Sequence, residues 1–557
     1  MAQTCHSGLT IDATLMPASS KQIANPDVLW EIFSLLASFD QYNSQPLKTL
    51  RIASHVCTSW RQLILSSPLL WARIINVDEL IQMTDDWRTE VIRRTGDAVL
   101  SIRGTGYRVS AKSERFIVFL LRDNWYRIKY IQIFLSSLSL HRPSVFSQIL
   151  QTPAPNLEYF AVECGSLETG FPNNRRNQEV EGSEDLVVGG DSWTCHSVSF
   201  GGQAPKLKHF SCADLLLPPA EQFCFLQVVH LECGETNGEV LLNALAFMPK
   251  IETLHVHIIE DLPNIPIFSP TNIVFLPHLH HVRITTDTVW QVGLTILISL
   301  RPCPGFQLEF DVREGQGDIT IAGGDVIKDV LSRFLTDTSG ELKENTLEVK
   351  LYGDVFYMFT PDKFRLDFYC WNCVAPLIRI LSIPQAAFLQ ATELNIDIIR
   401  ENQETDEIIA NFFSSLAVAH SLCTNSETLA YIHELSLGYP DKHLLPALKH
   451  LELRGYEMGL ANMIEEFLGY RRDAYGTPIQ SITASGLWGA NLCNLERFDG
   501  ILFRGYFGDT EVCYVCGSGS PETLDFTATA AQTEDPAIRR MEIDRLLTEL
   551  SGEEEEE

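Results

Sequence analysis

The stretch that decides the fold reads Pro249-Lys250-Ile251-Glu252-Thr253-Leu254-His255-Val256. Counted from Ile251, apolar side chains stand at the first, fourth and sixth positions. The fourth and sixth residues alternate with polar neighbours, which is the pattern of a short strand with one face turned inward. The first-position residue is expected to pack beneath that strand.

The same pattern recurs along most of the chain. A lead-in of proline, any residue, an apolar residue and a polar residue occurs at five places: Pro155-Asn156-Leu157-Glu158, Pro205-Lys206-Leu207-Lys208, Pro249-Lys250-Ile251-Glu252, Pro277-His278-Leu279-His280 and Pro446-Ala447-Leu448-Lys449. Apolar residues stand at positions one, four and six in ten segments: Ile128-Ile131-Ile133, Leu157-Phe160-Val162, Leu207-Phe210-Cys212, Leu226-Val229-Leu231, Ile251-Leu254-Val256, Leu279-Val282-Ile284, Ala391-Leu394-Ile396, Ile432-Leu435-Leu437, Leu448-Leu451-Leu453 and Ile479-Ile482-Ala484. Such self-similarity is typical of stacked repeats.

Helical patterns lie between some of these segments, at 238–248 and 288–300. Strand, loop, helix and return is the unit of a leucine-rich-repeat solenoid. The sequence therefore predicts an α/β fold, an irregular solenoid with parallel strands on one side and helices or loops on the other. Two or three further repeats are expected between Leu279 and Ala391, near Leu308-Phe310-Val312 and Leu347-Val349-Leu351. An unrelated α/β fold that imitates a few of these units is the alternative.

The N-terminal part of the chain carries a helical pattern instead. Asn25 stands where it caps a helix that begins at Pro26, and apolar residues follow on one wide face. A second helix is expected around Leu50, Ala53 and Val56, and a third, capped by Thr58 or Ser59, around Trp60, Leu63 and Ile64. So small a bundle buries too little of its own surface, so either the rest of the chain or another protein is expected to cover it.

Two stretches of this head resemble the F-box: Pro26-Asp27-Val28-Leu29-Trp30-Glu31-Ile32-Phe33, and His55-Val56-Cys57-Thr58-Ser59-Trp60-Arg61-Gln62-Leu63-Ile64 followed by Ser67-Pro68-Leu69-Leu70-Trp71. The chain is similar in particular to F-box-like proteins of mushroom-forming fungi, which have long leucine-rich bodies. The resemblance implies an N-terminal three-helix F-box that docks into a groove of a Skp-type adaptor, which links it to a cullin–RING ubiquitin ligase. By resemblance, the adaptor-binding residues are Pro26, Leu29, Ile32, Phe33, Val56, Cys57 and Trp60.

The resemblance implies a substrate-receptor subunit of a Skp–cullin–F-box ubiquitin ligase. The head would bind the adaptor, the repeat body would bind a target protein, and partner subunits would transfer ubiquitin to the tethered target. The alternative is a non-catalytic leucine-rich-repeat scaffold whose F-box does not recruit a ligase. Its support is the opening Ala24-Asn25, where the family usually has Leu-Pro.

Five segments are expected along the chain. They are a disordered tail (1–22), the F-box-like domain (23–75), a linker or first cap of the solenoid (76–125), the degenerate repeat domain (126–525) with an acidic insertion (171–191), and a C-terminal helix with an acidic tail (526–557).

Charge argues against a nucleic-acid partner. The chain has 42 Lys and Arg against 72 Asp and Glu, a formal net charge of −30, whereas binding to phosphates needs a basic surface. Residues 1–94 carry eight bases and nine acids, so the remainder carries −29, which favours either a basic target surface or simply solubility. With no apolar signal core and no membrane-length apolar run, we expect a cytoplasmic or nuclear protein that binds no membrane and whose cysteines are reduced.

Patterns that carry catalytic chemistry are missing from the sequence. The pairs Cys370/Cys373 and Cys513/Cys516 lie too far apart in a solenoid to form one four-ligand zinc site. The histidines are interpreted as unpaired, with His278, His280 and His281 on solvated surface. There is no P-loop, HExxH or GxSxG motif. We therefore expect no enzyme activity, no metal and no cofactor.

Overall fold

The computed structural model divides into two compact units, residues 1–228 and 229–557. It describes residues 25–37, 45–81, 83–104, 111–136, 148–165, 200–212, 217, 227–234, 238–258, 273–286, 290–301, 306–315, 319, 321–335, 346–352, 354–361, 364–370, 373–382, 390–400, 403–454, 460–476, 478–485, 490–507 and 510–527. The predicted tail at 1–22, the acidic insertion at 171–191 and most of the C-terminal segment at 526–557 lie outside these residues.

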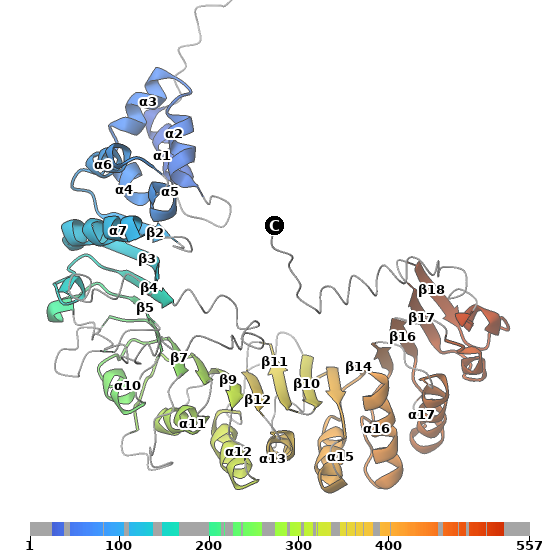
Figure 1. Ribbon diagram of the computed structural model, residues 1–557. Helices are drawn as coiled ribbons and strands as arrows, with labels where there is room; N and C mark the ends of the chain where they lie inside the picture. The colour runs from blue at the N-terminus through green and yellow to red at the C-terminus, as the bar shows by residue number, and fades with distance from the viewer. Residues whose placement is uncertain are drawn as a thin grey trace, which may run out of the picture. The chain divides into compact units, whose positions relative to one another are not determined.

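Unit 1 begins with a head of four short helices, one more than the three that were predicted (Figure 1). They are α1 (Pro26–Leu36), α2 (Pro46–Ala53), α3 (Thr58–Leu65) and α4 (Pro68–Arg73). Asn25 caps α1 as predicted, its side chain accepting a hydrogen bond from the Asp27 amide at 3.0 Å. The predicted cap of α3 is wrong, because the Cys57 sulfur accepts from the Trp60 amide at 3.5 Å. Val56 lies in the turn after α2 and not within that helix.

The interior of the head consists of apolar side chains from all four helices. Leu29, Phe33, Leu50, Ile64 and Trp71 are all buried. The Trp71 indole nitrogen donates to the Ile64 carbonyl at 2.8 Å, which satisfies the one polar atom of this buried ring. These helices therefore enclose a small core of their own.

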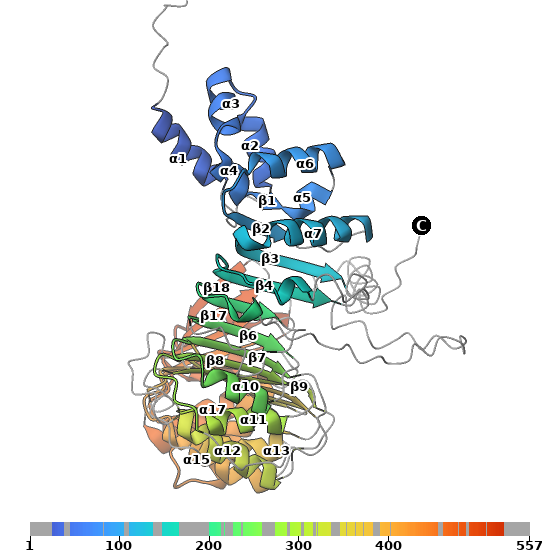
Figure 2. The same cartoon turned by 90° about the vertical axis from the view of Figure 1, so that its left-hand side faces the viewer.

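The rest of unit 1 builds a parallel sheet of five described strands. They are β1 (Ile75–Asn76), β2 (Leu100–Gly104), β3 (Ile128–Ser136), β4 (Tyr159–Gly165) and β5 (His209–Cys212), paired in chain order. Between them stand α5 (Val77–Ile81), α6 (Asp85–Arg94), α7 (Ala111–Asn124) and the short 3₁₀ turns η1 (Trp125–Arg127) and η3 (Phe200–Gly202). Because β1 pairs with β2, the predicted domain boundary at residue 75 falls inside this sheet. Helix α7 lies beside β2 and β3 (Figure 2).

The sheet of unit 1 has the register that the repeat pattern requires. Ile102, Ile131, Phe160 and Phe210 lie opposite one another on consecutive strands, and all four are fully buried. The predicted fourth-position residues at 131, 160 and 210 are therefore confirmed as one buried row.

Unit 2 contains thirteen strands among its described residues. They are β6 (His230–Gly234), β7 (Thr253–Ile258), β8 (His281–Thr286), β9 (Gln307–Gly315), β10 (Thr346–Tyr352), β11 (Val355–Thr360), β12 (Phe364–Cys370), β13 (Glu393–Ile398), β14 (Ser421–Thr424), β15 (His450–Leu453), β16 (Ser481–Ser485), β17 (Leu502–Phe507) and β18 (Thr510–Val515). Pairing runs β6-β7-β8-β9-β12-β11-β10-β13 and then in chain order to β18. The β10–β11, β11–β12 and β17–β18 pairs are antiparallel, and the other pairs are parallel.

Helices lie along one side of the unit 2 sheet (Figure 1). They are α10 (Gly238–Leu245), α11 (Trp290–Ser299), α12 (Ile321–Leu335), α13 (Val374–Leu377), α15 (Asp406–Ser415), α16 (Ser426–Gly438) and α17 (Leu460–Tyr475), with 3₁₀ turns η5 (Ile378–Ser382), η6 (Gln403–Thr405), η7 (Cys493–Arg497) and η8 (Pro521–Leu524). The helical segments predicted at 238–248 and 288–300 are confirmed as α10 and α11. The predicted class, a mixed α/β fold with a long and mostly parallel sheet, is confirmed.

Two of the predicted repeats are wrong in detail. Leu231 lies opposite Leu254, so the fourth and sixth residues of that repeat are Leu231 and Cys233, two residues later than predicted. The segment Ile432-Leu435-Leu437 lies in α16, because a spacing of three residues fits a helix face as well as a strand. The strand of this repeat is β14, where the polar residue Thr424 occupies a buried position, so a pattern of apolar residues does not include it.

The long gap between predicted repeats is filled as expected by β9 and β10. The sequence pattern did not indicate that β11 and β12 would follow β10 as an antiparallel excursion. In this excursion β12 returns to pair with β9, and β10 pairs onward with β13.

Candidate functional site

The head exposes part of the predicted adaptor-binding set and buries the rest. Pro26, Cys57 and Val56 are exposed, and Val56 retains 62% of its accessible surface. Ile32 is 43% exposed and Trp60 is half-buried. Leu29 and Phe33 are 5% and 0% exposed, so the structure places them in the core of the head and not on its surface.

Besides Ile32, the head exposes apolar residues that the predicted set did not include, among them Val28 and Leu35. On α1, Val28, Ile32 and Leu35 stand at spacings of four and three residues, which puts them on one helix face. Other exposed apolar side chains of the head are Ile52, Leu65 and Leu69. The head thus has a core of its own and, in addition, an apolar face on α1 that the other described residues leave open.

The body offers a second surface, the open face of the unit 2 sheet opposite the helices. Eleven strand pairings place twelve residues of this face opposite one another in a single row. From β6 to β17 the row consists of Glu232, His255, Arg283, Glu309, Arg365, Phe359, Glu348, Asn395, Cys423, Glu452, Thr483 and Arg504. The row holds both acidic and basic side chains, so this face is not uniformly acidic.

Ion pairs link neighbouring strands and neighbouring residues on this face. Glu309 lies 3.2 Å from the His281 ring nitrogen and 3.4 Å from the Arg283 guanidinium. On β12, Arg365 donates to Asp367 at 3.0 Å. Burial raises the pKa of Asp367 above its ordinary value despite this arginine, and the nearby Asp311 carboxylate adds to the rise.

Three histidines form a ladder across β6, β7 and β8. The His255 ring makes edge contacts with the rings of His230 and His281, with centroids 4.9 and 5.2 Å apart. Burial lowers the pKa of His255 to about 4, and the neighbouring histidines contribute to the fall; burial also lowers the pKa of His230. The sequence-based interpretation that the histidines are unpaired is therefore wrong. The signal in the sequence was the place of these histidines on consecutive repeats.

His230, Glu232 and His255 also bring potential metal ligands together. One ligand atom from each of the three lies within 4.8 Å of the others, and this is the one group of its kind in the described part of the chain. The expectation of no metal site rested on cysteines and on motifs within one segment. The three residues lie on two strands that the repeat register places side by side, so no motif within one segment contains them.

The cysteines of the two Cys-x-x-Cys pairs behave as packed thiols where they are described. Cys373 is buried, with its sulfur 3.7 Å from the Phe368 carbonyl. Cys516 is buried, and this burial raises the pKa of its thiol to about 11, while the exposed Cys513 lies 3.5 Å from a Glu511 oxygen. A thiol with a raised pKa stays protonated near neutral pH, so it is a poor nucleophile and a poor metal ligand.

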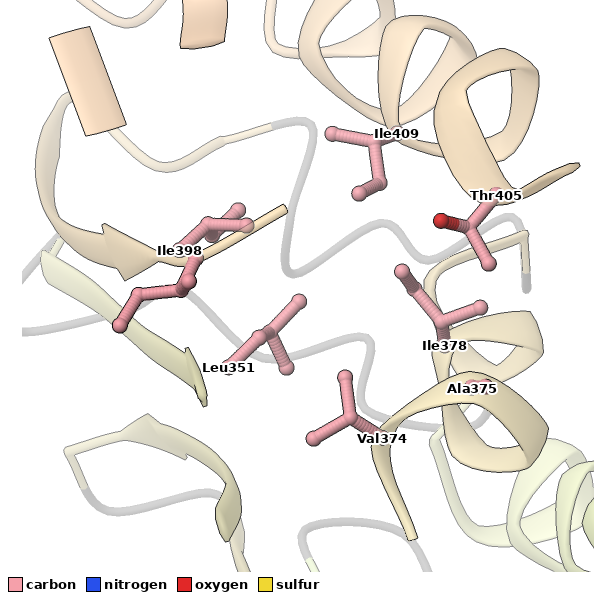
Figure 3. Close-up of a pocket in the computed structure, with 8 residues that line it drawn as sticks. Leu351, Val374, Ala375, Ile378, Ile398, Thr405 and Ile409 are labelled. Carbon is pink, nitrogen blue, oxygen red and sulfur yellow. The ribbon is translucent and has the colours of Figure 1, made fainter. Parts of the chain in front are cut away.

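A small cavity lies in unit 2 between the sheet and its helices (Figure 3). Its volume is about 10 Å³, and its lining residues are Leu351, Val374, Ala375, Ile378, Ile398, Ile399, Thr405 and Ile409. The apolar side chains around it leave room for one water at most. It is therefore a gap in packing and not a substrate site.

Among the helices in the described ranges, none combines the length and the apolar character needed to span a membrane. A scan against protein-family models found none that matches the chain, and a search of curated proteins found no match.

Proposed function

We propose that this chain is a substrate-receptor subunit of a Skp–cullin–F-box ubiquitin ligase. Its head binds a Skp-type adaptor, and its repeat body binds a target protein. The observation that carries the proposal is the apolar face of α1, where Val28, Ile32 and Leu35 are exposed although the head already has a core. The sequence of the head resembles the F-box, and this resemblance is the reason for proposing a Skp-type adaptor as the partner of that face.

The division between buried and exposed residues refines the roles within the proposed interface. Ile32 and Val56 contact the adaptor directly, with Trp60 at the edge of the contact. Leu29 and Phe33 support the interface from the core of the head, because they hold α1 against α2 and α3. An amphipathic helix that lays its apolar face into a groove is a common mode of protein recognition.

The open face of the unit 2 sheet is the proposed surface for the target. Its row of acidic and basic side chains, interrupted by Phe359, offers both ion pairs and an aromatic contact. Complementary charge gives specificity and speeds encounter. This pattern favours a target surface of mixed charge over the uniformly basic one suggested by net charge alone.

The test measures binding of the full-length chain to a purified Skp-type adaptor by calorimetry, and then binding of the cullin N-terminal domain to that complex. We expect Ile32→Glu and Val56→Glu to weaken adaptor binding at least tenfold each. Leu437→Glu, at an exposed leucine on α16, is the matched control and leaves binding unchanged. Adaptor binding that persists in both head variants overturns the proposal.

The cullin step separates the ligase from a scaffold. A complex of chain and adaptor that never captures cullin favours the non-catalytic scaffold whose F-box does not recruit a ligase. Capture of cullin by the wild-type complex, lost together with the adaptor in Ile32→Glu, supports the substrate receptor.

A further inference from the structure

We propose that His230, Glu232 and His255 bind one divalent cation of the zinc class on the open face of the unit 2 sheet. The ligands come from two adjacent parallel strands, β6 and β7. Each of the three offers one ligand atom, and these atoms lie within 4.8 Å of one another. This inference concerns unit 2 alone and does not depend on what the head binds.

The register of the two strands creates the group. Glu232 lies directly opposite His255, and His230 lies opposite Thr253. Residues 230 and 232 are two apart on one strand, so their side chains stand on the same face. In a tetrahedral site with zinc–ligand bonds of about 2.0–2.1 Å, neighbouring ligand atoms are roughly 3.4 Å apart. Side-chain movements of about an ångström are enough for the three groups to close around an ion.

The surroundings of each histidine ring support metal binding in a different way. The Nδ1 atom of His230 contacts the Thr253 hydroxyl, which holds the ring and leaves Nε2 as its ligand atom. The Nε2 atom of His255 is buried and has no hydrogen-bond partner among the described residues. Buried polar atoms normally have a partner, and a bound cation supplies one.

The ligand set selects the class of ion. Two imidazoles and one carboxylate suit zinc and the neighbouring transition metals, whereas magnesium and calcium prefer oxygen ligands throughout. Three protein ligands leave a fourth position for water. Arg283, opposite His255 on β8, is the neighbouring positive charge in this row. It lies 3.4 Å from the Glu309 carboxylate, so that carboxylate offsets much of its repulsion toward a cation.

A second place in the chain offers a matched control. The triplet His-Leu-Glu recurs at 450–452, and His450 Nδ1 lies 2.8 Å from the Ser481 hydroxyl, a contact that parallels the one between His230 and Thr253. Glu452, however, lies opposite Thr483 and not opposite a histidine. The two places therefore differ in the one residue that completes the proposed ligand set.

The experiment uses the full-length chain after chelator treatment and dialysis against Zn²⁺, with bound zinc measured by mass spectrometry and Co²⁺ used as a spectroscopic probe. We expect one zinc per chain, tetrahedral Co²⁺ absorption, and at least a tenfold loss of affinity in His255→Ala and in Glu232→Gln. His450→Ala should change neither quantity. Thr483→His should raise the stoichiometry to two.

Circular dichroism of the metal-free variants checks that they are folded. If a variant fails to fold, the gain expected from Thr483→His still decides the question, because it depends on no loss of function. Wild-type chain that binds no zinc, or zinc binding that is equal in wild type, His255→Ala and Glu232→Gln, overturns the site.

Discussion

The ring of Phe33 packs edge-on against the ring of Trp60, with centroids 5.0 Å apart and the ring planes at 74°. The contact joins α1 to α3 across the core of the head. Phe33 is fully buried, whereas Trp60 is half-buried and reaches the surface. One aromatic pair therefore connects the interior of the head to the face proposed for the adaptor.

Loss of the Phe33 ring should loosen the head and leave unit 2 intact. Replacing a buried phenylalanine with alanine costs about 3–5 kcal/mol through lost burial and the cavity left behind. We expect Phe33→Ala to speed hydrogen exchange in peptides covering 26–36 and 58–65, with no change in peptides from β13 to β16. Ile32→Ala, at the exposed neighbour, is the control and should leave exchange nearly as in wild type. Equal protection in Phe33→Ala and wild type would show that the head core does not depend on this ring.

The head shows which features of the fold can be predicted from the sequence and which cannot. Asn25 before Pro26 predicted the start of α1 correctly, because the capping group and the helix are adjacent in the chain. The same pattern could not separate Ile32 from Phe33, since both belong to one wide apolar stripe. Only the position of α3, which brings Trp60 onto Phe33, decides which side of that stripe is buried.

The histidine cluster shows the opposite limit. His230 and His255 are 25 residues apart in the sequence, and their proximity depends on the pairing of β6 with β7. In the predicted repeat, Val229 was taken for the fourth position, and this slip of two residues set His230 opposite His255, where the structure has Glu232. The register of two parallel strands decides which of their side chains lie side by side. Local sequence patterns specify that register only when every repeat is aligned correctly.

Gly324 allows α12 to approach α13 closely. A Cβ atom at this position would lie 2.3 Å from the Pro376 carbonyl oxygen, which is backbone and has no freedom to rotate away. We expect Gly324→Ala to destabilise unit 2 by about 1–3 kcal/mol through overpacking. Thermal unfolding followed by circular dichroism measures this change.

Gly469, in α17, is the matched control for that substitution. It lies in a helix as Gly324 does, but a Cβ atom added there would meet no other atom within 4 Å. We expect Gly469→Ala to be stabilising by about 0.5–1 kcal/mol, because alanine favours the helix over the unfolded chain. Two glycine-to-alanine changes of equal effect would show that the contact with Pro376 is not limiting.

Asp367 should make unit 2 less stable as the pH rises above the acidic range. Its pKa is raised in the folded chain, so the folded state holds this proton more tightly than the unfolded state does. The stability that results is fully present below pH 3.8 and is lost as the pH rises through the folded-state pKa. Asp367→Asn removes this loss, so we expect the variant to gain stability relative to wild type as the pH rises above 3.8. Urea denaturation at several pH values measures the difference, and Asp441→Asn, at an exposed aspartate, should show none.

Replacing Arg127 with lysine should destabilise unit 1. Its guanidinium donates to the Asn124 side chain, to the Thr95 hydroxyl at 3.0 Å and to the Ala98 carbonyl at 3.0 Å. It thereby ties the loop between α6 and β2 to the turn before β3. A lysine has three donors on one atom and does not reproduce this fork, so some of these buried acceptors lose their partner. We expect Arg127→Lys to cost about 2–3 kcal/mol, read as faster hydrogen exchange in β2 and β3. Arg122→Lys, at an exposed arginine on α7, should have almost no effect, and an Arg127→Lys chain with wild-type exchange would contradict the role given to the fork.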